Sequence, residues 1–176
     1  MSKVDRWIVV VGRDGGPHDR IECALRSDGS SPAREFLIGL KAGALKSRGD
    51  RGVDPDSTQV HDFFVLLDRM RATAYSGEPA HGRTGVNSLG AGLWEFKGGT
   101  ARIPFFDVDQ FGRHEPKNEE TDRAIADPDS RREYWWYPDL DPVLRLTHGF
   151  FKDSQRTDQR ELDLANEIRG EDLAHG

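Results

Sequence analysis

The stretch LRLTHGFFKDSQRTDQRELDLA, residues 144–165, decides the fold that we expect for this chain. Its first residues alternate as in a β-strand, with one side made up of Leu144, Leu146 and His148. Gly149 then interrupts the alternation. A helix pattern follows, in which Thr157 or Asp158 can cap the first turn and Glu161 can complete a capping box. The stretch therefore predicts a strand that leads through a basic turn into a helix.

Two further helix patterns precede this stretch. Ser31 followed by Pro32 is a typical helix start, because proline is tolerated at the first helical position. The buried stripe expected for that helix is Phe36, Leu37 and Leu40. The second pattern, over residues 60–74, repeats apolar residues at helical spacing. We expect this helix to anchor the core by burying Phe63, Phe64 and Leu67.

Two β-hairpins are also predicted. Residues 7–11 are apolar and β-branched, and residues 21–26 alternate after a turn-rich connection, which indicates an N-terminal hairpin. Residues 93–97 and 100–106 flank two glycines that suit a two-residue turn. Pro104 has no N–H to donate to a neighbouring strand, so it predicts a bulge or a sheet edge at that point.

Composition narrows the class of protein. With 176 residues, we expect one domain over 1–176 with enough chain for a core. Charged residues make up 32% of the chain, and its single cysteine excludes a disulfide framework. No apolar run reaches the roughly 18 residues that a membrane span needs, and the N-terminus lacks the apolar core of a signal peptide. We therefore expect a soluble, cytoplasmic protein that does not interact with membranes.

The negative charge is concentrated in one segment. Residues 107–141 hold 11 acidic and five basic residues, and the resulting charge of −6 equals the net charge of the whole chain. Within this segment, residues 110–140 form a turn-rich acidic insertion between two predicted strands. The insertion ends with the aromatic run Tyr134 to Tyr137. These rings either pack back on the domain or contact a partner, because exposed aromatic clusters are costly.

Three blocks of residues occur in an order that is typical of one protein family. The first block is SPAREFL at 31–37, the second is GLWEFK at 92–97 followed by ARI at 101–103, and the third is LTHGFFKDSQRTDQRELDLA at 146–165. Together they resemble the phage-derived RelE/HigB-like toxins of type II toxin–antitoxin systems, and the resemblance extends over most of residues 21–173. The resemblance implies an α+β, RelE-like fold, with two N-terminal helices packed on an antiparallel sheet and a C-terminal helix.

The resemblance also implies a function. Such toxins are endoribonucleases (mRNA interferases) that cleave mRNA with no metal or other cofactor, and the resemblance implies cleavage on the ribosome. A small antitoxin, usually of the helix-turn-helix type, is the expected partner. Metal-free cleavage requires the ribose 2′-OH to attack the adjacent phosphate while Arg and Lys side chains stabilise the charge that develops. A side chain that carries protons near neutral pH is the remaining requirement.

The candidate catalytic residues are Arg102, Lys152, Lys97, Arg156 and His148, and the candidates for binding RNA are Arg145, Lys97 and Arg160. Arg102 matches the arginine on the family's strand, and Lys152 matches the first lysine of its usual Lys–Lys pair. Lys97 keeps the charge of the family's arginine but not its two-pronged geometry. His148 either carries a proton or is a buried, hydrogen-bonded core residue. Glu95 either accepts a proton or only pairs with a cation across the hairpin.

Two alternatives stay open. Asp153 stands where the family has its second lysine. Together with Pro104 and the net acidity, it favours a non-catalytic, phage-derived RelE-fold protein that only binds an antitoxin or another partner. In the other alternative, residues 110–140 lie over the basic site as an acidic flap and inhibit it. A metal site is not predicted, because the six histidines are scattered along the chain and form no His-x-x-x-His pair.

Overall fold

The computed structural model of the chain describes residues 4–45, 56–76, 86–117, 120–121, 135–136, 139–152 and 156–175. The helices within these residues are α1 (Pro32–Ala42), α2 (Ser57–Ser76) and α3 (Gln159–Ala174). The strands are β1 (Ile8–Val11), β2 (Arg20–Cys23), β3 (Val86–Gly90), β4 (Leu93–Gly98), β5 (Ala101–Val108), β6 (Glu120–Thr121), β7 (Trp135–Trp136), β8 (Val143–Leu146) and β9 (Phe150–Phe151). All three expected helices and both expected hairpins are therefore present.

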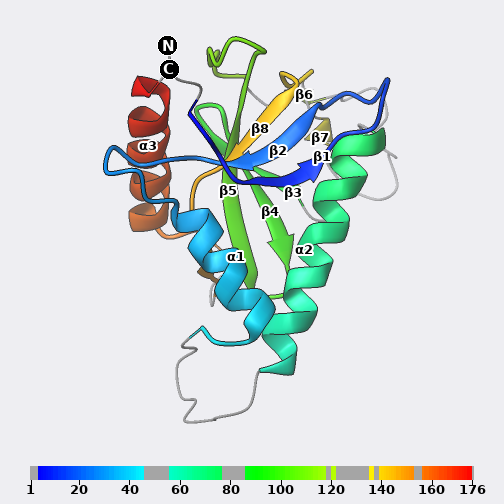
Figure 1. Cartoon of the computed structure of the whole chain (residues 1–176), viewed down its shortest axis with the longest axis vertical. Helices are drawn as coiled ribbons and strands as arrows, with labels where there is room; N and C mark the ends of the chain where they lie inside the picture. The colour runs from blue at the N-terminus through cyan, green and yellow to red at the C-terminus, as the bar shows by residue number, and fades with distance from the viewer. Residues whose placement is uncertain are drawn as a thin grey trace.

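Most of the strands form one mixed sheet (Figure 1). Its order is β1-β2-β8-β5-β4-β3, and β9 pairs with β5 next to β8. Strands β2 and β8 run parallel, whereas the other neighbours in this sheet are antiparallel. The α+β class is confirmed, but the expected antiparallel sheet is wrong at this pair, and the sheet is larger than expected. The parallel pair requires a long crossover connection, and here that connection contains α1, α2 and the β4–β5 hairpin.

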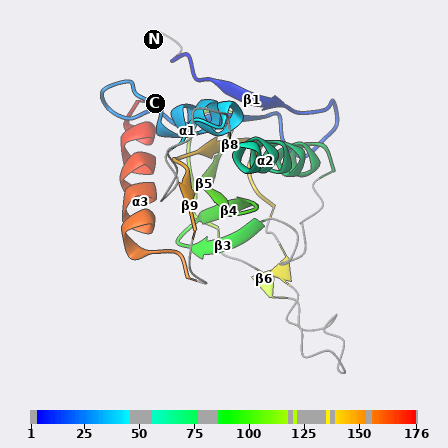
Figure 2. The same cartoon turned by 90° about the horizontal axis from the view of Figure 1, so that it is seen from below.

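The helices lie on both faces of the sheet. Figure 2 shows α1 and α2 side by side over one face, with α3 apart from them. The core under α1 and α2 includes Phe36, Leu37, Leu66, Phe96 and Phe105. A second core packs α3 against the opposite face through Ala165, Ile168, Leu93, Phe106 and Val108. Both faces of the central strands are therefore covered, at least in part, by helices.

The second helix buries a slightly different stripe from the one predicted. Phe63, Leu66 and Met70 are buried, but Phe64 is 50% exposed. The buried stripe is thus rotated away from Phe64 and toward Leu66, which the prediction did not include. Gly98 explains why the helix can approach the sheet so closely, because a Cβ atom there would lie 2.5 Å from Leu66 Cγ.

Helix boundaries follow the expected capping chemistry only in part. Ser31 occupies the N-cap position of α1, but its hydroxyl donates to the carbonyl of Ala24 at 2.9 Å instead of capping the helix. Asp158 does cap α3, since its side chain accepts from the Arg160 N–H at 3.0 Å. The carboxylate of Glu161 is bonded to His148, so Glu161 links the helix to the sheet.

Pro104 lies opposite a break in the neighbouring strand. Glu95 pairs with Pro104 from β4, and on the other side the Pro104 carbonyl accepts from Thr147 N at 2.9 Å. Thr147 follows β8, and the chain resumes pairing with β5 only at β9. The missing N–H of Pro104 therefore faces this interruption, because the N–H and C=O of one strand residue point to the same side.

Gly149 lies in the same interruption and packs against α1. A Cβ atom at Gly149 would lie 1.9 Å from Phe36 Cδ1. Glycine is required here because the backbone between β8 and β9 passes directly against this ring.

Residues 110–140 connect β5 to β8, which are neighbours in the sheet. Near its two ends, Lys117 Nζ lies 2.7 Å from Asp107 Oδ2 and 2.9 Å from Asp141 Oδ2. Within the connection, β6 pairs with β7. Tyr134 and Tyr137 lie outside the described residues, as does most of the segment that the acidic-flap hypothesis concerns.

Candidate active site

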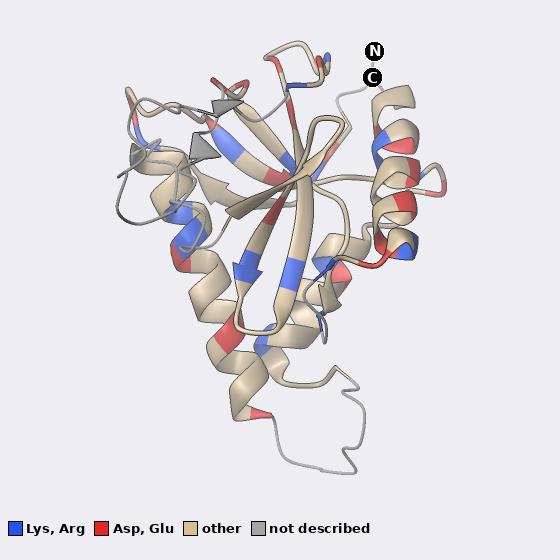
Figure 3. Ribbon diagram, turned by 180° about the vertical axis from the view of Figure 1, so that it is seen from behind, with Lys and Arg blue, Asp and Glu red and all other residues tan. Residues whose placement is uncertain are grey.

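The β4–β5 hairpin places the predicted basic residues on the side of the sheet opposite α1 and α2. Trp94 and Phe96 belong to the core under these helices, so the alternation of the strand turns Glu95 and Lys97 to the other side. Arg102 on β5 is the cross-strand partner of Lys97. In Figure 3, which views the sheet from behind, the basic parts of β4 and β5 lie side by side.

Glu95 lies within this group and is completely buried. Its Oε1 is 3.7 Å from Arg102 Nε, and both atoms are buried without a hydrogen bond. Its Oε2 accepts a hydrogen bond of 3.3 Å from Thr157 Oγ1. Burial raises the pKa of Glu95 above its ordinary value of 4.5, although the charges of Lys152, Arg102 and Lys97 act in the opposite direction.

Lys97 lies beside Glu95 along the strand and is partly buried. Burial, reinforced by the positive charge of Arg102, lowers the pKa of Lys97 below its ordinary value of 10.5. Arg69 on α2 donates to the backbone carbonyl of Lys97. The ammonium is thus closer than an ordinary lysine to releasing a proton near neutral pH.

Arg102 and Lys152 complete the group. Arg102 Nη1 donates to the carbonyls of Gly99 at 2.6 Å and Ala101 at 2.8 Å, which orients the guanidinium along the hairpin turn. Lys152 directly follows β9, and its N–H donates to the Thr100 carbonyl at 2.8 Å. Its charge acts on Glu95, for which it is the largest influence that favours the ionised form. We call Glu95, Lys97, Arg102 and Lys152 the Glu95 cluster.

Arg156 and Arg160 lie outside this cluster. Both are exposed, and Arg156 precedes α3 by a few residues. Arg160 is in the first turn of α3, where its Nη2 is 3.9 Å from Glu161 Oε1 and its side chain is 88% exposed. Each is accessible to a large ligand, whereas Lys152, Arg102 and Lys97 are the charges that act most on the buried carboxylate of Glu95.

His148 is a buried, hydrogen-bonded residue. Its Nε2 donates to Glu161 Oε2 at 2.7 Å, and its Nδ1 lies 3.1 Å from Thr147 Oγ1. Burial lowers the pKa of His148 below its ordinary value of 6.5. Both ring nitrogens have protein partners, so His148 attaches α3 to the segment that follows β8.

Arg145 occupies a different place from the one predicted. It is 4% exposed, and it donates to Glu22 Oε1 at 2.9 Å and to Asp172 Oδ2 at 2.7 Å. Contrary to the prediction, it has no access to a bound RNA. Alternation along β8 turned Arg145 away from the main core, but α3 covers that side of the strand.

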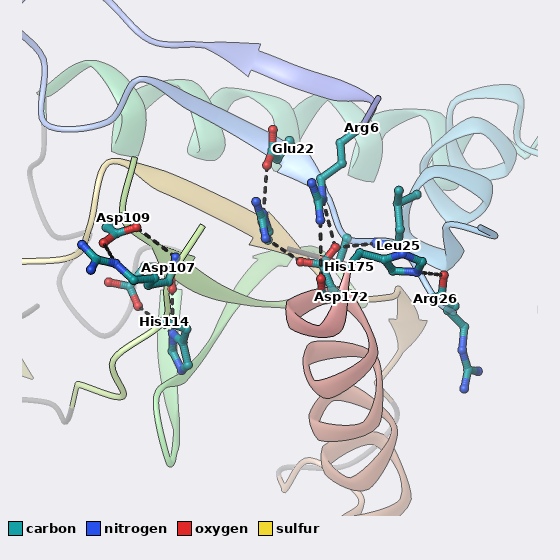
Figure 4. A network of polar contacts seen from close by, with 12 residues as sticks. Arg6, Glu22, Leu25, Arg26, Asp107, Asp109, His114, Asp172 and His175 are labelled. Atoms are coloured by element: carbon teal, nitrogen blue, oxygen red, sulfur yellow. Dashed lines mark hydrogen bonds and ion pairs between the residues drawn. The ribbon is translucent and has the colours of Figure 1, made fainter. Parts of the chain in front are cut away.

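Sequence reasoning missed the network around Asp172 (Figure 4). Asp172 Oδ1 accepts from Arg6 Nε at 3.0 Å and from Leu25 N at 2.8 Å, while Arg145 binds Oδ2. We call Arg6, Glu22, Arg145 and Asp172 the Asp172 network. This network fixes the end of α3 to the sheet. The start of α3 lies near the Glu95 cluster, because Thr157, just before the helix, donates a hydrogen bond to Glu95. A lone aspartate near a helix end gives no sequence signal for such distant partners.

The described residues also bear on the presence of a metal site and of a membrane-spanning helix. Among the described residues, no group of three His, Cys, Asp or Glu side chains is arranged to hold a metal ion. None of the described helices is long and apolar enough to cross a membrane. No protein-family model matches the chain, and no curated protein matches it.

Proposed function

We propose that this chain is a toxin of the RelE/HigB-like type that cleaves mRNA, and that the Glu95 cluster is its active site. The observation that carries the proposal is a fully buried carboxylate with one unbonded oxygen beside three basic side chains. A buried polar atom without a hydrogen bond costs stability. Titratable groups with shifted pKa values and specific charged partners are typical of active sites.

The cluster supplies the groups that metal-free RNA cleavage requires. Ionised Glu95 accepts the proton of a ribose 2′-OH, and the 2′-oxygen forms a bond to the adjacent phosphorus. Arg102 and Lys152 stabilise the negative charge on the phosphate oxygens as this bond forms. The bond from phosphorus to the 5′-oxygen then breaks, and Lys97 donates a proton to that oxygen. The products are a 2′,3′-cyclic phosphate and a 5′-hydroxyl.

The shifted pKa values suit these roles. A base with a pKa above 4.5 holds a proton more tightly than an ordinary glutamate, and an acid with a pKa below 10.5 releases one more readily than an ordinary lysine. Proton transfer is most efficient when the pKa values of base and acid approach the working pH. On this proposal a ribosome-bound mRNA in the cytoplasm is the substrate, and a small helix-turn-helix antitoxin that binds the toxin is the partner.

A non-catalytic RelE-fold protein that only binds an antitoxin or another partner is the second candidate. It is favoured by the complete burial of Glu95 and by the two carbonyls that hold Arg102. A phosphate has to displace contacts at both residues before it can react.

Inducible expression in a bacterial host, with growth recorded and RNA 5′ ends mapped, separates the two candidates. The toxin predicts growth arrest and new mRNA ends, both abolished by the Arg102→Ala/Lys152→Ala double variant. A matched Arg71→Ala/Arg113→Ala variant, which removes two exposed arginines outside the cluster, should keep the toxic effect. Normal growth with folded wild-type protein and no new RNA ends would contradict the toxin and favour the binding protein.

A further inference from the structure

The short strand β9 places one aromatic ring on each side of the sheet. Phe151 packs against the main core, and its ring centroid is 5.5 Å from that of Phe36. Successive strand residues point to opposite faces, so Phe150 lies on the side of the Glu95 cluster. Its side chain is half-buried, and a ring on that side is not needed to fill the core under α1 and α2.

Phe150 is the direct cross-strand partner of Arg102. Side chains at such opposite positions share one face of the sheet, with Cβ atoms about 5 Å apart. A phosphate bound by Arg102 therefore brings the bases of adjacent nucleotides within reach of the Phe150 ring. Lys152, two residues after Phe150 in sequence, adds positive charge on the same side.

The Phe150 ring is held in place from one side. It stacks on the imidazole of His148, with ring centroids 5.6 Å apart and an angle of 25° between the planes. His148 is in turn fixed by its contacts to Glu161 and Thr147. A ring that is already oriented loses little conformational freedom when it binds a ligand.

We propose that Phe150 is a stacking platform for an unpaired RNA base next to the phosphate at Arg102. The inference rests on the proposed function and adds to it a subsite for one base of the single-stranded substrate. Proteins usually bind single-stranded nucleic acid with aromatic side chains beside a basic surface, because any unpaired base can stack on an aromatic ring. A base in a duplex is already stacked between its neighbours and cannot reach such a ring. His148 is then a positioning residue for this platform.

The test measures binding of a short single-stranded RNA with 2′-O-methyl riboses, which cannot be cleaved because the attacking hydroxyl is blocked. Phe150→Ala should weaken binding on the order of tenfold to a hundredfold, as expected for the loss of one stacked base. Phe150→Trp should preserve the affinity. Phe111→Ala, which removes a phenylalanine that is 70% exposed in another part of the chain, is the matched control and should have no effect. Circular dichroism melts confirm that each variant is folded.

A second set of RNAs identifies the interaction that is lost. One base at a time is removed to leave an abasic site. At one position this removal should weaken wild-type binding as much as Phe150→Ala does, with little further loss when both changes are combined. A matched RNA duplex should bind the wild type more weakly than the single strand.

The outcomes distinguish the platform from the function on which it rests. Equal affinity of wild type and Phe150→Ala for the single strand would overturn the platform and leave RNA cleavage standing. Equal affinity for duplex and single strand would do the same. If the wild type bound no free RNA, the platform would be overturned, while the growth and RNA-end measurements in cells, where mRNA is on the ribosome, would still decide the proposed function.

Discussion

Glu95 and Asp172 are both fully buried carboxylates, but their surroundings differ. Both oxygens of Asp172 accept hydrogen bonds, from Arg6 and the Leu25 N–H on one side and from Arg145 on the other. Glu95 has one hydrogen bond of 3.3 Å, and its other oxygen stays 3.7 Å from Arg102. The two carboxylates are therefore equally buried, but Asp172 has hydrogen bonds at both oxygens and Glu95 at only one.

This difference distinguishes a buried carboxylate that stabilises the fold, Asp172, from one that is available to react, Glu95. Leaving a buried polar group without a partner costs about 1–3 kcal/mol, so Asp172 is suited to holding the fold and Glu95 is not. Asp107 is intermediate: Oδ1 lacks a hydrogen bond, but Lys117 Nζ lies 2.7 Å from Oδ2 and the Asp141 N–H also donates to that oxygen. Of these three carboxylates, Glu95 is the one that several cations surround without a direct hydrogen bond from any of them.

The largest effect is expected from breaking the Asp172 network. Asp172→Ala should lower the free energy of unfolding by about 3–5 kcal/mol, because it leaves the buried guanidinium of Arg145 without one of its charged partners. Urea denaturation measures the change. Asp163→Ala on the exposed side of the same helix is the control and should change little. A loss below about 1 kcal/mol for Asp172→Ala would refute the structural role of the network.

Removing Arg102 should have a catalytic effect of nearly similar size. Arg102→Ala should slow single-turnover RNA cleavage by about 10²–10³-fold, or roughly 2.7–4 kcal/mol, by analogy with the removal of one charge-stabilising donor. Stability should change far less than in Asp172→Ala. Arg102→Lys should restore part of the rate, since it returns the charge without the two-pronged geometry. Wild-type cleavage by Arg102→Ala would exclude this site.

His148 should behave like Asp172 and not like Glu95. His148→Gln should lower the free energy of unfolding by about 1–3 kcal/mol, because it disturbs the buried pair with Glu161. The cleavage rate at saturating RNA should fall by less than about tenfold, well below the 10²–10⁴-fold effect typical of a lost acid or base. A loss of cleavage as large as that of Arg102→Ala, in a protein of normal stability, would return His148 to the catalytic group.

The smallest effects are expected in the pH dependence of the cleavage rate, which tests the roles of Glu95 and Lys97 in the unaltered protein. Glu95 must be ionised to act as a base, so the rate should fall as the pH drops through a pKa above 4.5. Lys97 must be protonated to act as an acid, so the rate should fall as the pH rises through a pKa below 10.5. Lys97→Arg should remove the alkaline decline, because arginine does not release its proton in this range. An alkaline decline that persists in this variant would assign the acid to another group.

Local patterns in the sequence predicted most of the fold. The helices α1, α2 and α3 and the β4–β5 hairpin depend on spacing between near neighbours, so apolar periodicity and turn residues indicate them. The parallel pairing of β2 with β8 joins distant segments, as the 123-residue separation of Glu22 and Arg145 illustrates. No local pattern contains that information.

The candidate site was predictable to a similar degree. Lys97, Arg102 and Lys152 were named from the family resemblance, and the structure brings their charges together around Glu95. The burial of Glu95 and its contact with Thr157 join residues that are 62 positions apart, so no local pattern indicates them. Asp172 on α3 likewise binds Arg145, which strand alternation alone turns away from the main core.

One substitution tests the contrast between the two carboxylates most directly. Glu95 has a raised pKa in the folded protein, so its neutral form is favoured by folding and its ionised form opposes folding as the pH rises through that pKa. Glu95→Gln should therefore raise the midpoint of thermal unfolding at pH 7, and this gain should vanish below pH 4.5, where the wild-type side chain is protonated in both states. The same variant should lose RNA cleavage by about 10²–10⁴-fold. A Glu95→Gln protein that is less stable than the wild type at pH 7 and still cleaves RNA would contradict the account.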